Sequence, residues 1–197
     1  MKGGLLRMAQ LNWGDSPTPE RRVAFYPKNA PGYAWLGVTT IYPIDRIDNR
    51  RIFIDGVEHR HEMGGVDLAI AAVTFPDEFE QFNGFCNEEK PAFDLTFRVW
   101  QADGTYKLNL VYNVKAMQTV LVDPVNGRPM DEELFTWVCT TTPEVIPNAR
   151  SSAHLSIDTA SVSPNVVSTL EACLYGTDTI APTMPTVREL FAIFFKG

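Results

Sequence analysis

The 197-residue sequence has few cysteines and no long apolar run, and each shortage argues against a class of protein. The three cysteines are odd in number, lie far apart and form no CxxC pair. A disulfide framework or a zinc site is therefore not expected, and reduced, buried thiols are the default. No stretch reaches the roughly 20 apolar residues that span a bilayer, and the N-terminal residues lack the apolar core of a signal peptide. We expect a product made in the cytoplasm, with no membrane contact.

Positive charge is also scarce. The chain has 17 Lys and Arg residues against 24 Asp and Glu residues, which gives a formal net charge of −7. Because proteins bind nucleic acid mainly through clustered Lys and Arg, an acidic chain of this kind is not expected to bind DNA or RNA tightly. Such a chain can still lie beside DNA without holding it.

The common catalytic motifs are missing. The sequence contains no GxGxxG, Walker or GxSxG pattern. His59 and His61 alternate along a strand, so they share one face, and His154 or a carboxylate would complete a metal site. Two nearby histidines without a catalytic signature are a weak pattern. We therefore favour a polar, solvent-facing strand at this position and expect no metal.

The segment PDEFEQFNG, which begins at Pro76, combines carboxylates with aromatic side chains. Pro76 suits the first position of a helix, and the carboxylates after it suit the positive end of the helix dipole. Phe79 and Phe82 are three residues apart, so both would lie on the helix face that packs on a sheet. The carboxylates are Asp77, Glu78 and Glu80. We interpret them as a helix first turn and not as acid–base catalysts, and we expect no enzyme activity and no cofactor.

Turn residues punctuate the chain at short intervals. Its 14 prolines and 13 glycines indicate many strands joined by turns. Residues 1–32 are rich in Pro, Gly and polar groups and are predicted to form an extended arm. Strands are expected at 33–42, 66–75, 133–146 and 151–158, with a hairpin-like excursion from Asp45 to Gly65 that breaks at Asp55-Gly56 and at Gly64-Gly65.

The clearest hairpin lies within 92–120. Apolar and polar residues alternate on both sides of Asp103-Gly104, which is the strongest short-range signal for a hairpin. Each strand has one polar face, so we expect a sheet that packs on one side and is open on the other. The polar residues expected on the open face are Asp94, Thr96, Arg98, Lys107 and Asn109.

Two segments near the C-terminus have helix signals. After Ser163, Pro164 occupies the first helical position, and Gly176 ends a convincing helix. The tail 186–195, TVRELFAIFF, carries a Thr-x-x-Glu capping box, but its Phe- and Ile-rich run equally suits an edge strand, and we favour the strand. The chain is predicted to be one mainly β domain, 1–197: a sandwich or barrel of two packed antiparallel sheets with one main flanking helix and one short helix.

Long amphipathic strands leave surplus strand edges, which proteins normally blunt or occupy with a partner. An assembling structural protein fits this pattern better than a monomeric enzyme.

Four short motifs follow one another along the chain: FPDEF at 75–79, Trp137 with TTTP at 140–143, LSID at 155–158 and LYGT at 174–177.

In this order the motifs resemble those of the major tail proteins (tail tube subunits) of long-tailed, non-contractile bacteriophages. The resemblance covers residues 66–190 and, more loosely, 25–42. The chain departs from the family pattern at Phe75, where Tyr is usual, and in a short, divergent segment at 43–65. These departures leave open whether the chain is the main tube subunit or a related minor tail protein.

The resemblance implies a structural virion protein. Copies would form hexameric rings, and rings would stack into a tube through which DNA passes without specific binding. The implied partners are other copies, the tape measure protein, the terminator and the tail tip. The implied location is the phage tail, after synthesis in the bacterial cytoplasm. The alternatives are a minor tail or tail-completion (terminator) protein that forms a single ring and, more remotely, a small metal-dependent enzyme using His59 and His61.

Three sets of residues follow from this interpretation. The expected inter-ring or inter-subunit contacts are Arg21, Phe25, Tyr26, Asp45, Arg46, Asp48, Arg50 and Arg51. The expected lumen-facing residues are the polar hairpin set: Asp94, Thr96, Arg98, Lys107 and Asn109. The expected structural residues are Pro76, Phe79, Phe82, Trp137, Asp158 and Ser163.

Overall fold

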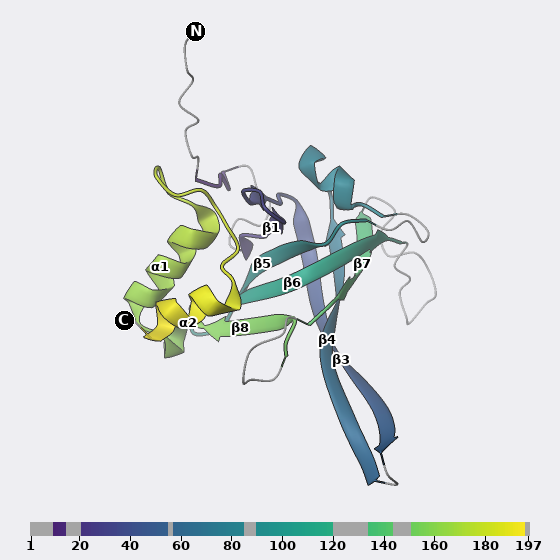
Figure 1. The fold of residues 1–197 in the computed structure, drawn as a ribbon. Coiled ribbons are helices and arrows are strands. Elements are labelled where there is room, and N and C mark those ends of the chain that lie inside the picture. The colour runs from purple at the N-terminus through teal and green to yellow at the C-terminus, as the bar shows by residue number, and fades with distance from the viewer. Residues whose placement is uncertain are drawn as a thin grey trace.

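The structure, a computed structural model, describes residues 10–14, 21–54, 57–84, 90–119, 134–143 and 151–195, with the backbone alone described within 43–65. The prediction of a mainly β fold with a flanking helix is confirmed (Figure 1). The strands are β1 (Ala24–Pro27), β2 (Tyr33–Ala34), β3 (Val38–Ile54), β4 (Val57–Ala72), β5 (Phe93–Trp100), β6 (Tyr106–Gln118), β7 (Phe135–Thr141) and β8 (His154–Asp158). The helices are the 3₁₀ turns η2 (Asp77–Phe82) and η3 (Thr159–Ser161) and the α-helices α1 (Pro164–Tyr175) and α2 (Val187–Phe195).

All described strands belong to one antiparallel sheet in the order β2-β1-β5-β6-β7-β4-β3, with β8 also paired to β6. Strand β6 is the branch point, because its residues 107–111 pair with β8 and its residues 114–118 pair with β7. The predicted two sheets are therefore hydrogen-bonded into one sheet. It folds into two layers at β6, one containing β1, β5 and β8 and the other containing β7, β4 and β3.

A bulge in β6 changes which face its side chains occupy. Asn113 has a φ of 53°, in the left-handed region that Asn tolerates better than most residues. Its backbone N–H donates to Asp94 Oδ1 at 2.8 Å, and the β5–β6 register shifts at this point. As a result, Tyr112 packs in the core beside the helices, whereas Val114 packs in the core between the layers.

Aromatic side chains fill the core between the two layers. The buried ring of Phe79 lies 5.4 Å from that of Phe93 in one layer and 5.6 Å from that of Trp137 in the other, centroid to centroid. Trp35 lies closer still, at 4.2 Å. The prediction that Phe79 and Phe82 bury this segment against the sheet is confirmed. Pro76 precedes the helix at the cap position instead of occupying its first turn, and the helix is a 3₁₀ turn.

Helices α1 and α2 cover the other face of the first layer (Figure 1). Leu108 and Leu110 of β6 pack there with Leu170 and Leu174 of α1. The predicted ends of α1 are confirmed. Ser163 Oγ accepts a hydrogen bond from the Val166 N–H at 3.4 Å, and Gly176 follows the helix with a φ of 76°.

The C-terminal tail is a helix, so the edge strand favoured from the sequence is wrong. The capping box forms: the Thr186 N–H and hydroxyl both donate to Glu189 Oε2 at 2.8 Å, and the Glu189 N–H donates back to Thr186 Oγ at 3.3 Å. Val187 and Leu190 are buried against the helix-side core. The capping box and this buried face decide in favour of the helix over the β propensity of Phe and Ile.

The extended arm predicted for residues 1–32 is wrong in its last part. Strand β1 lies inside the sheet, between β2 and β5. Farther toward the N-terminus, the Leu11 N–H donates to the Tyr175 carbonyl at 2.9 Å, and the Trp13 ring packs edge-on to the Tyr175 ring. Residues 1–9 and 15–20 of the predicted arm lie outside the described residues.

Strands β3 and β4 form one long hairpin. The strand predicted at 33–42 stops before Pro43, and a break was predicted at Gly64-Gly65, but β3 and β4 both run through these positions. Pro43 is tolerated because β3 is an edge strand, where one side of the backbone has no partner strand in the described part of the chain. The Asp103-Gly104 turn occurs as predicted, with Gly104 at a φ of 83°.

Candidate functional site: assembly surfaces

The outer part of the β3–β4 hairpin projects from the body of the protein on the side away from α1 and α2 (Figure 1). We call residues 46–65 the arm. Strand β7 pairs with β4 only from Leu68 to Ala72, so within the described residues the arm pairs only with itself. At roughly 3.3 Å per residue it extends about 30 Å. An isolated two-stranded ribbon is marginally stable in water, so such an arm is typically held by a partner.

The residues predicted to make inter-subunit contacts fall into two groups. Asp45, Arg46, Asp48, Arg50 and Arg51 lie on β3, in the arm or at its base, and their side chains are outside the described part. Phe25 and Tyr26 are buried because β1 is an internal strand, so the prediction of contacts is wrong for these two residues. Arg21, just before β1, is half-buried.

Most of the polar hairpin residues expected to face a lumen are buried, so the expectation of an open face there is wrong. Asp94, Thr96 and Arg98 lie on the face of β5 that the helices cover, because Leu108 and Leu110, the cross-strand neighbours of Arg98 and Thr96, pack there. Asn109 and Lys107 lie on the opposite face of β6, and of the five residues only Lys107 is exposed. Each buried group has a partner from elsewhere in the chain. Asn109 Oδ1, for example, lies 2.9 Å from His154 Nε2 of β8. Arg98 joins the sheet to α1 through Glu171, whereas Thr96, Asp94 and Asn109 bond to β1, to Lys28 after it and to β8.

Arg98 is the centre of the largest of these polar clusters. Its guanidinium forms an ion pair with Glu171 of α1 and lies over the ring of Tyr106, 4.4 Å from the centroid. The Tyr106 hydroxyl donates to Glu171 Oε1 at 2.7 Å. Partial burial and then this hydrogen bond raise the pKa of Tyr106 to about 12. Burial likewise raises the pKa of Tyr175, whose ring the guanidinium also faces.

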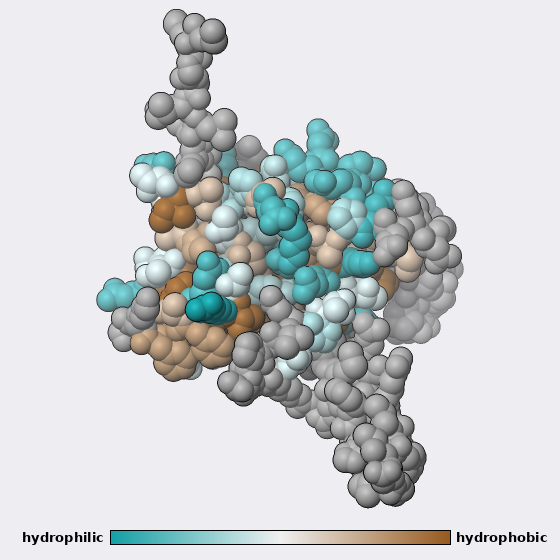
Figure 2. All heavy atoms as spheres, in the orientation of Figure 1, coloured by the Kyte–Doolittle hydropathy of each residue, from teal (hydrophilic) through white to brown (hydrophobic). Residues whose placement is uncertain are grey.

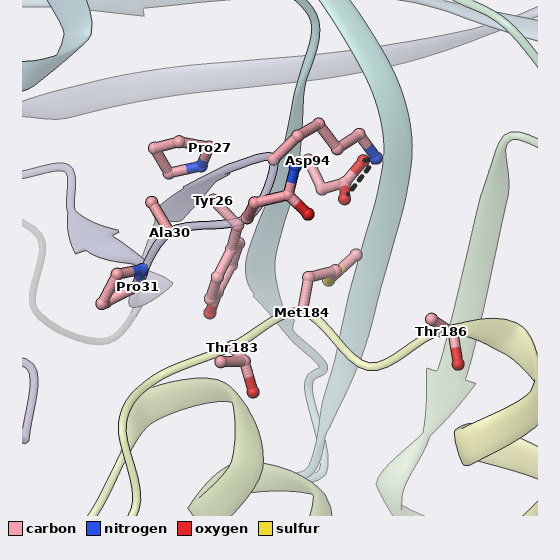
Figure 3. Close-up of a pocket in the computed structure, with 10 residues that line it drawn as sticks. Tyr26, Pro27, Ala30, Pro31, Asp94, Thr183, Met184 and Thr186 are labelled. Carbon is pink, nitrogen blue, oxygen red and sulfur yellow. Dashed lines mark hydrogen bonds and ion pairs between the residues drawn. The ribbon is translucent and has the colours of Figure 1, made fainter.

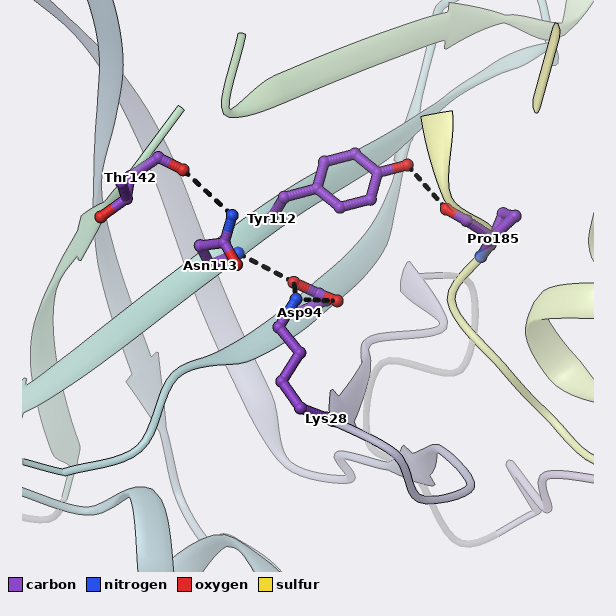
Figure 4. Close-up of polar contacts among 6 residues, drawn as sticks. All are labelled: Lys28, Asp94, Tyr112, Asn113, Thr142 and Pro185. Carbon is purple, nitrogen blue, oxygen red and sulfur yellow. Dashed lines mark hydrogen bonds and ion pairs between the residues drawn. The ribbon is translucent and has the colours of Figure 1, made fainter. Parts of the chain in front are cut away.

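A second polar cluster secures the bulge. Lys28 Nζ contacts both carboxylate oxygens of Asp94 at 2.7 Å, and Asp94 also accepts the Asn113 N–H (Figure 4). Beside it lies a cavity of about 460 Å³, lined in part by Tyr26, Met184 and Lys28 (Figure 3). Asp94 already neutralises the ammonium group that borders the cavity. The cavity therefore offers no unpaired charge that would identify a ligand.

The second layer of the sheet has one face that no described element covers. Tyr42, Ala69, Val138 and Met117 lie opposite one another across β3, β4, β7 and β6. Tyr42 is 62% exposed and Met117 44%, whereas Ala116, next to Met117 on β6, and Leu68, next to Ala69 on β4, are buried. We call this surface, with Thr140, Lys115 and Asp67 in the adjacent row, the bare face. The alternation of apolar and polar residues in β6 and β7 indicates that each strand has two different faces. It does not show which face stays uncovered.

On the opposite side of the protein, α2 and β8 border an apolar groove of about 410 Å³. Figure 2 shows apolar surface gathered over the position that α2 occupies in Figure 1. The groove was not expected from the sequence, since it exists only because the tail is helical. Its lining residues are Leu155, Ser156, Ile157, Val187, Leu190, Phe191, Phe194 and Phe195.

Within the described ranges, no group of three or more His, Cys, Asp or Glu side chains is placed to hold a metal ion. His59 and His61 lie on the arm, where side chains are not described. Burial raises the pKa of the Cys139 thiol, which disfavours the reactive thiolate. No helix in the described part of the chain is long and apolar enough to cross a membrane.

The structural residues expected from the sequence lie at junctions of the fold. Trp137 Nε1 donates to Asn83 Oδ1 at 2.8 Å, joining β7 to the segment after η2. Asp158 accepts the Ala160 N–H at 3.0 Å and caps η3.

Comparisons of the chain with protein-family models, curated proteins and solved structures find no match.

Proposed function

We propose that this chain is a structural subunit of a phage tail tube, which forms hexameric rings that stack into a conduit for DNA. The arm is the observation that carries the proposal. A hairpin of this length, with no partner strand among the described residues, suits a protein whose neighbours supply the missing contacts. The order of sequence motifs from FPDEF to LYGT supports the same class.

In this proposal the bare face replaces the polar hairpin as the wall of the bore. Its residues are mostly uncharged, and the adjacent row adds one Lys, at position 115, and one Asp, at position 67. A wall without clustered Lys and Arg gives phosphates little to bind, and the net charge of −7 opposes close association with DNA. Free movement of DNA past such a wall is the property that a conduit requires.

A minor tail or tail-completion protein is the second candidate, favoured by the divergent segment 43–65 that forms the arm. Such a protein would form one ring and stop. Electron microscopy of the concentrated, purified protein distinguishes these cases. Long tubes are expected for a tube subunit, and isolated rings would favour the terminator. A protein that remains monomeric at high concentration would contradict both.

A further inference from the structure

A chemically labile dipeptide, Asn83–Gly84, lies directly after η2 and packs against β6 and β7. We call this contact the η2–β7 junction. Asn is among the thermolabile residues, and Gly after it adds no side chain that would hinder attack by the backbone nitrogen. Both residues are buried, and Asn83 is only 3% exposed. A reactive pair thus occupies a position on which the core depends.

The reaction open to this pair is deamidation, which consumes only water. The Gly84 nitrogen gives up its proton to a base and attacks the Asn83 side-chain carbon Cγ, and the adduct expels the side-chain nitrogen as ammonia. Water then opens the resulting succinimide ring at either carbonyl, which leaves Asp or isoaspartate at position 83. The side-chain amide and water are converted into an acid and ammonia, without an oxidant, a reductant or a cofactor.

The backbone conformation of the folded chain opposes ring closure. The ring requires the Gly84 nitrogen to lie on the same side of the Asn83 Cα–C bond as Cβ. Asn83 has a φ of −75° and a ψ of 93°, which places that nitrogen on the opposite side. Reaction therefore requires a large rotation about this bond, and such a rotation moves the chain on both sides of it.

Hydrogen bonds on both sides of the reacting bond resist this rotation. Asn83 Oδ1 accepts from Trp137 Nε1 of β7 at 2.8 Å, and the Asn83 N–H donates to the Glu80 carbonyl at 3.2 Å. The Gly84 carbonyl accepts the Gln118 N–H of β6 at 2.8 Å. Rotation is possible only after the segment has separated from β6 and β7.

We propose that Asn83–Gly84 is a deamidation site that the η2–β7 junction keeps closed, with the Trp137 indole N–H as the group that holds the side chain in place. The site reacts only in molecules whose junction has opened, so its rate follows the population of this local opening. The inference concerns the chemistry of a single chain and is independent of the proposed function.

The reaction would prevent the junction from closing again as before. Asp at position 83 places a carboxylate where the side chain is buried, and a buried charge without a cation beside it is costly. Isoaspartate also adds a carbon to the main chain directly after η2. Phe79 and Phe82, which fill the core from η2, lose their anchor in either case.

Incubation of the full-length wild-type chain at mildly alkaline pH tests the site. One sample is folded and the other is unfolded in urea at the same pH, and peptide mass spectrometry follows the conversion of Asn83. We expect the conversion to be at least tenfold slower in the folded chain. A smaller difference would overturn the proposal, because the junction would then give no protection.

Two matched substitutions test the role of Trp137. Trp137→Phe removes the donor to Asn83, whereas Trp35→Phe removes an equally buried indole whose Nε1 donates to the Thr74 carbonyl at 3.2 Å. We expect Asn83 to convert at least tenfold faster in Trp137→Phe than in Trp35→Phe. Tenfold corresponds to about 1.4 kcal/mol, within the usual cost of leaving a buried acceptor without a donor. Equal rates would show that overall stability, and not Trp137, protects the site.

The product of the reaction supplies a further test, which also applies if Trp137→Phe does not fold. Asn83→Asp keeps the size of the side chain and an acceptor for the Trp137 N–H, so it adds only the charge. We expect the midpoint of urea unfolding to shift to lower urea concentration. An unchanged midpoint would contradict the claim that deamidation damages the junction.

Discussion

The ring of Phe79 lies between the two layers of the sheet, 5.6 Å from that of Trp137 in β7 and 5.4 Å from that of Phe93 in β5. One side chain from a short 3₁₀ turn thus joins the two layers. The carboxylates around it are exposed, as a helix first turn allows. The PDEFEQF segment therefore has a structural role, because Phe79 packs the two layers together.

Phe79→Ala should destabilise the fold strongly. Removing a fully buried phenyl ring leaves a cavity, and typical losses are about 3–5 kcal/mol. Glu78→Gln, at an exposed position one residue away, should change the free energy of unfolding by no more than about 0.5 kcal/mol. Urea unfolding of both variants checks this, and equal or reversed effects would mean that the segment has a different role.

Glu171→Gln tests the anchoring of α1 to the sheet. The substitution leaves the Arg98 guanidinium, which is 7% exposed, without its ion-pair partner. We expect a loss of about 2–3 kcal/mol, less than for a fully buried pair because Glu171 keeps contact with solvent. The matched control is Glu80→Gln, which removes an exposed carboxylate and should have little effect in the same urea experiment.

At alkaline pH, deprotonation of the buried tyrosine hydroxyls should unfold the protein. The pKa of Tyr106 is raised to about 12, and burial raises the pKa of Tyr26 and Tyr175 as well. A raised pKa means that the folded state holds the proton more tightly than the unfolded state, whose value is about 10. This stabilisation is complete below pH 10 and is lost as pH rises toward 12.

Absorbance at 295 nm, which follows tyrosine ionisation, should therefore rise together with loss of the circular dichroism signal above pH 10. Tyr106→Phe should reduce the pH dependence between 10 and 12. Ionisation of all six tyrosines, including Tyr26, Tyr106 and Tyr175, near pH 10 with the structure intact would show that these hydroxyls are not held as described.

Thr186→Ala tests the capping box of α2. The substitution removes the acceptor for the Glu189 N–H and the hydroxyl that donates to Glu189, and losses at such caps are about 1 kcal/mol. Thr186→Ser keeps the hydroxyl and should lose much less. Hydrogen exchange of the α2 amides should accelerate in the first variant and not in the second, whereas equal protection in both would argue against the cap.

The secondary structure could be predicted where local signals agreed. Alternation around Asp103-Gly104 predicted the central hairpin, and Ser163, Pro164 and Gly176 predicted α1 to within a residue. The tail was ambiguous because Phe and Ile suit strands, while the Thr186–Glu189 capping box favoured a helix. In this case the cap was the more informative signal.

The burial of the polar hairpin face could not be predicted from local alternation. Asp94 is paired with Lys28, 66 residues away, and Arg98 with Glu171, 73 residues away. Such pairs depend on how distant segments pack, which a period of two does not encode. The bulge at Asn113 is a further reason why the prediction failed. It moves Val114 to the face opposite Tyr112, although apolar and polar residues continue to alternate in the sequence there.

The most direct test of the assembly account is sedimentation velocity of the wild-type chain beside a chain with a shortened arm. Replacing residues 48–63 by Asn-Gly joins Ile47 to Gly64, which are paired in the β3–β4 register, through a favoured hairpin turn. We predict that the wild-type chain forms heavy, concentration-dependent polymers and that the shortened chain stays monomeric with the same thermal unfolding midpoint. Equal polymerisation of the two chains, or a wild-type chain that remains monomeric at every concentration, would contradict the account.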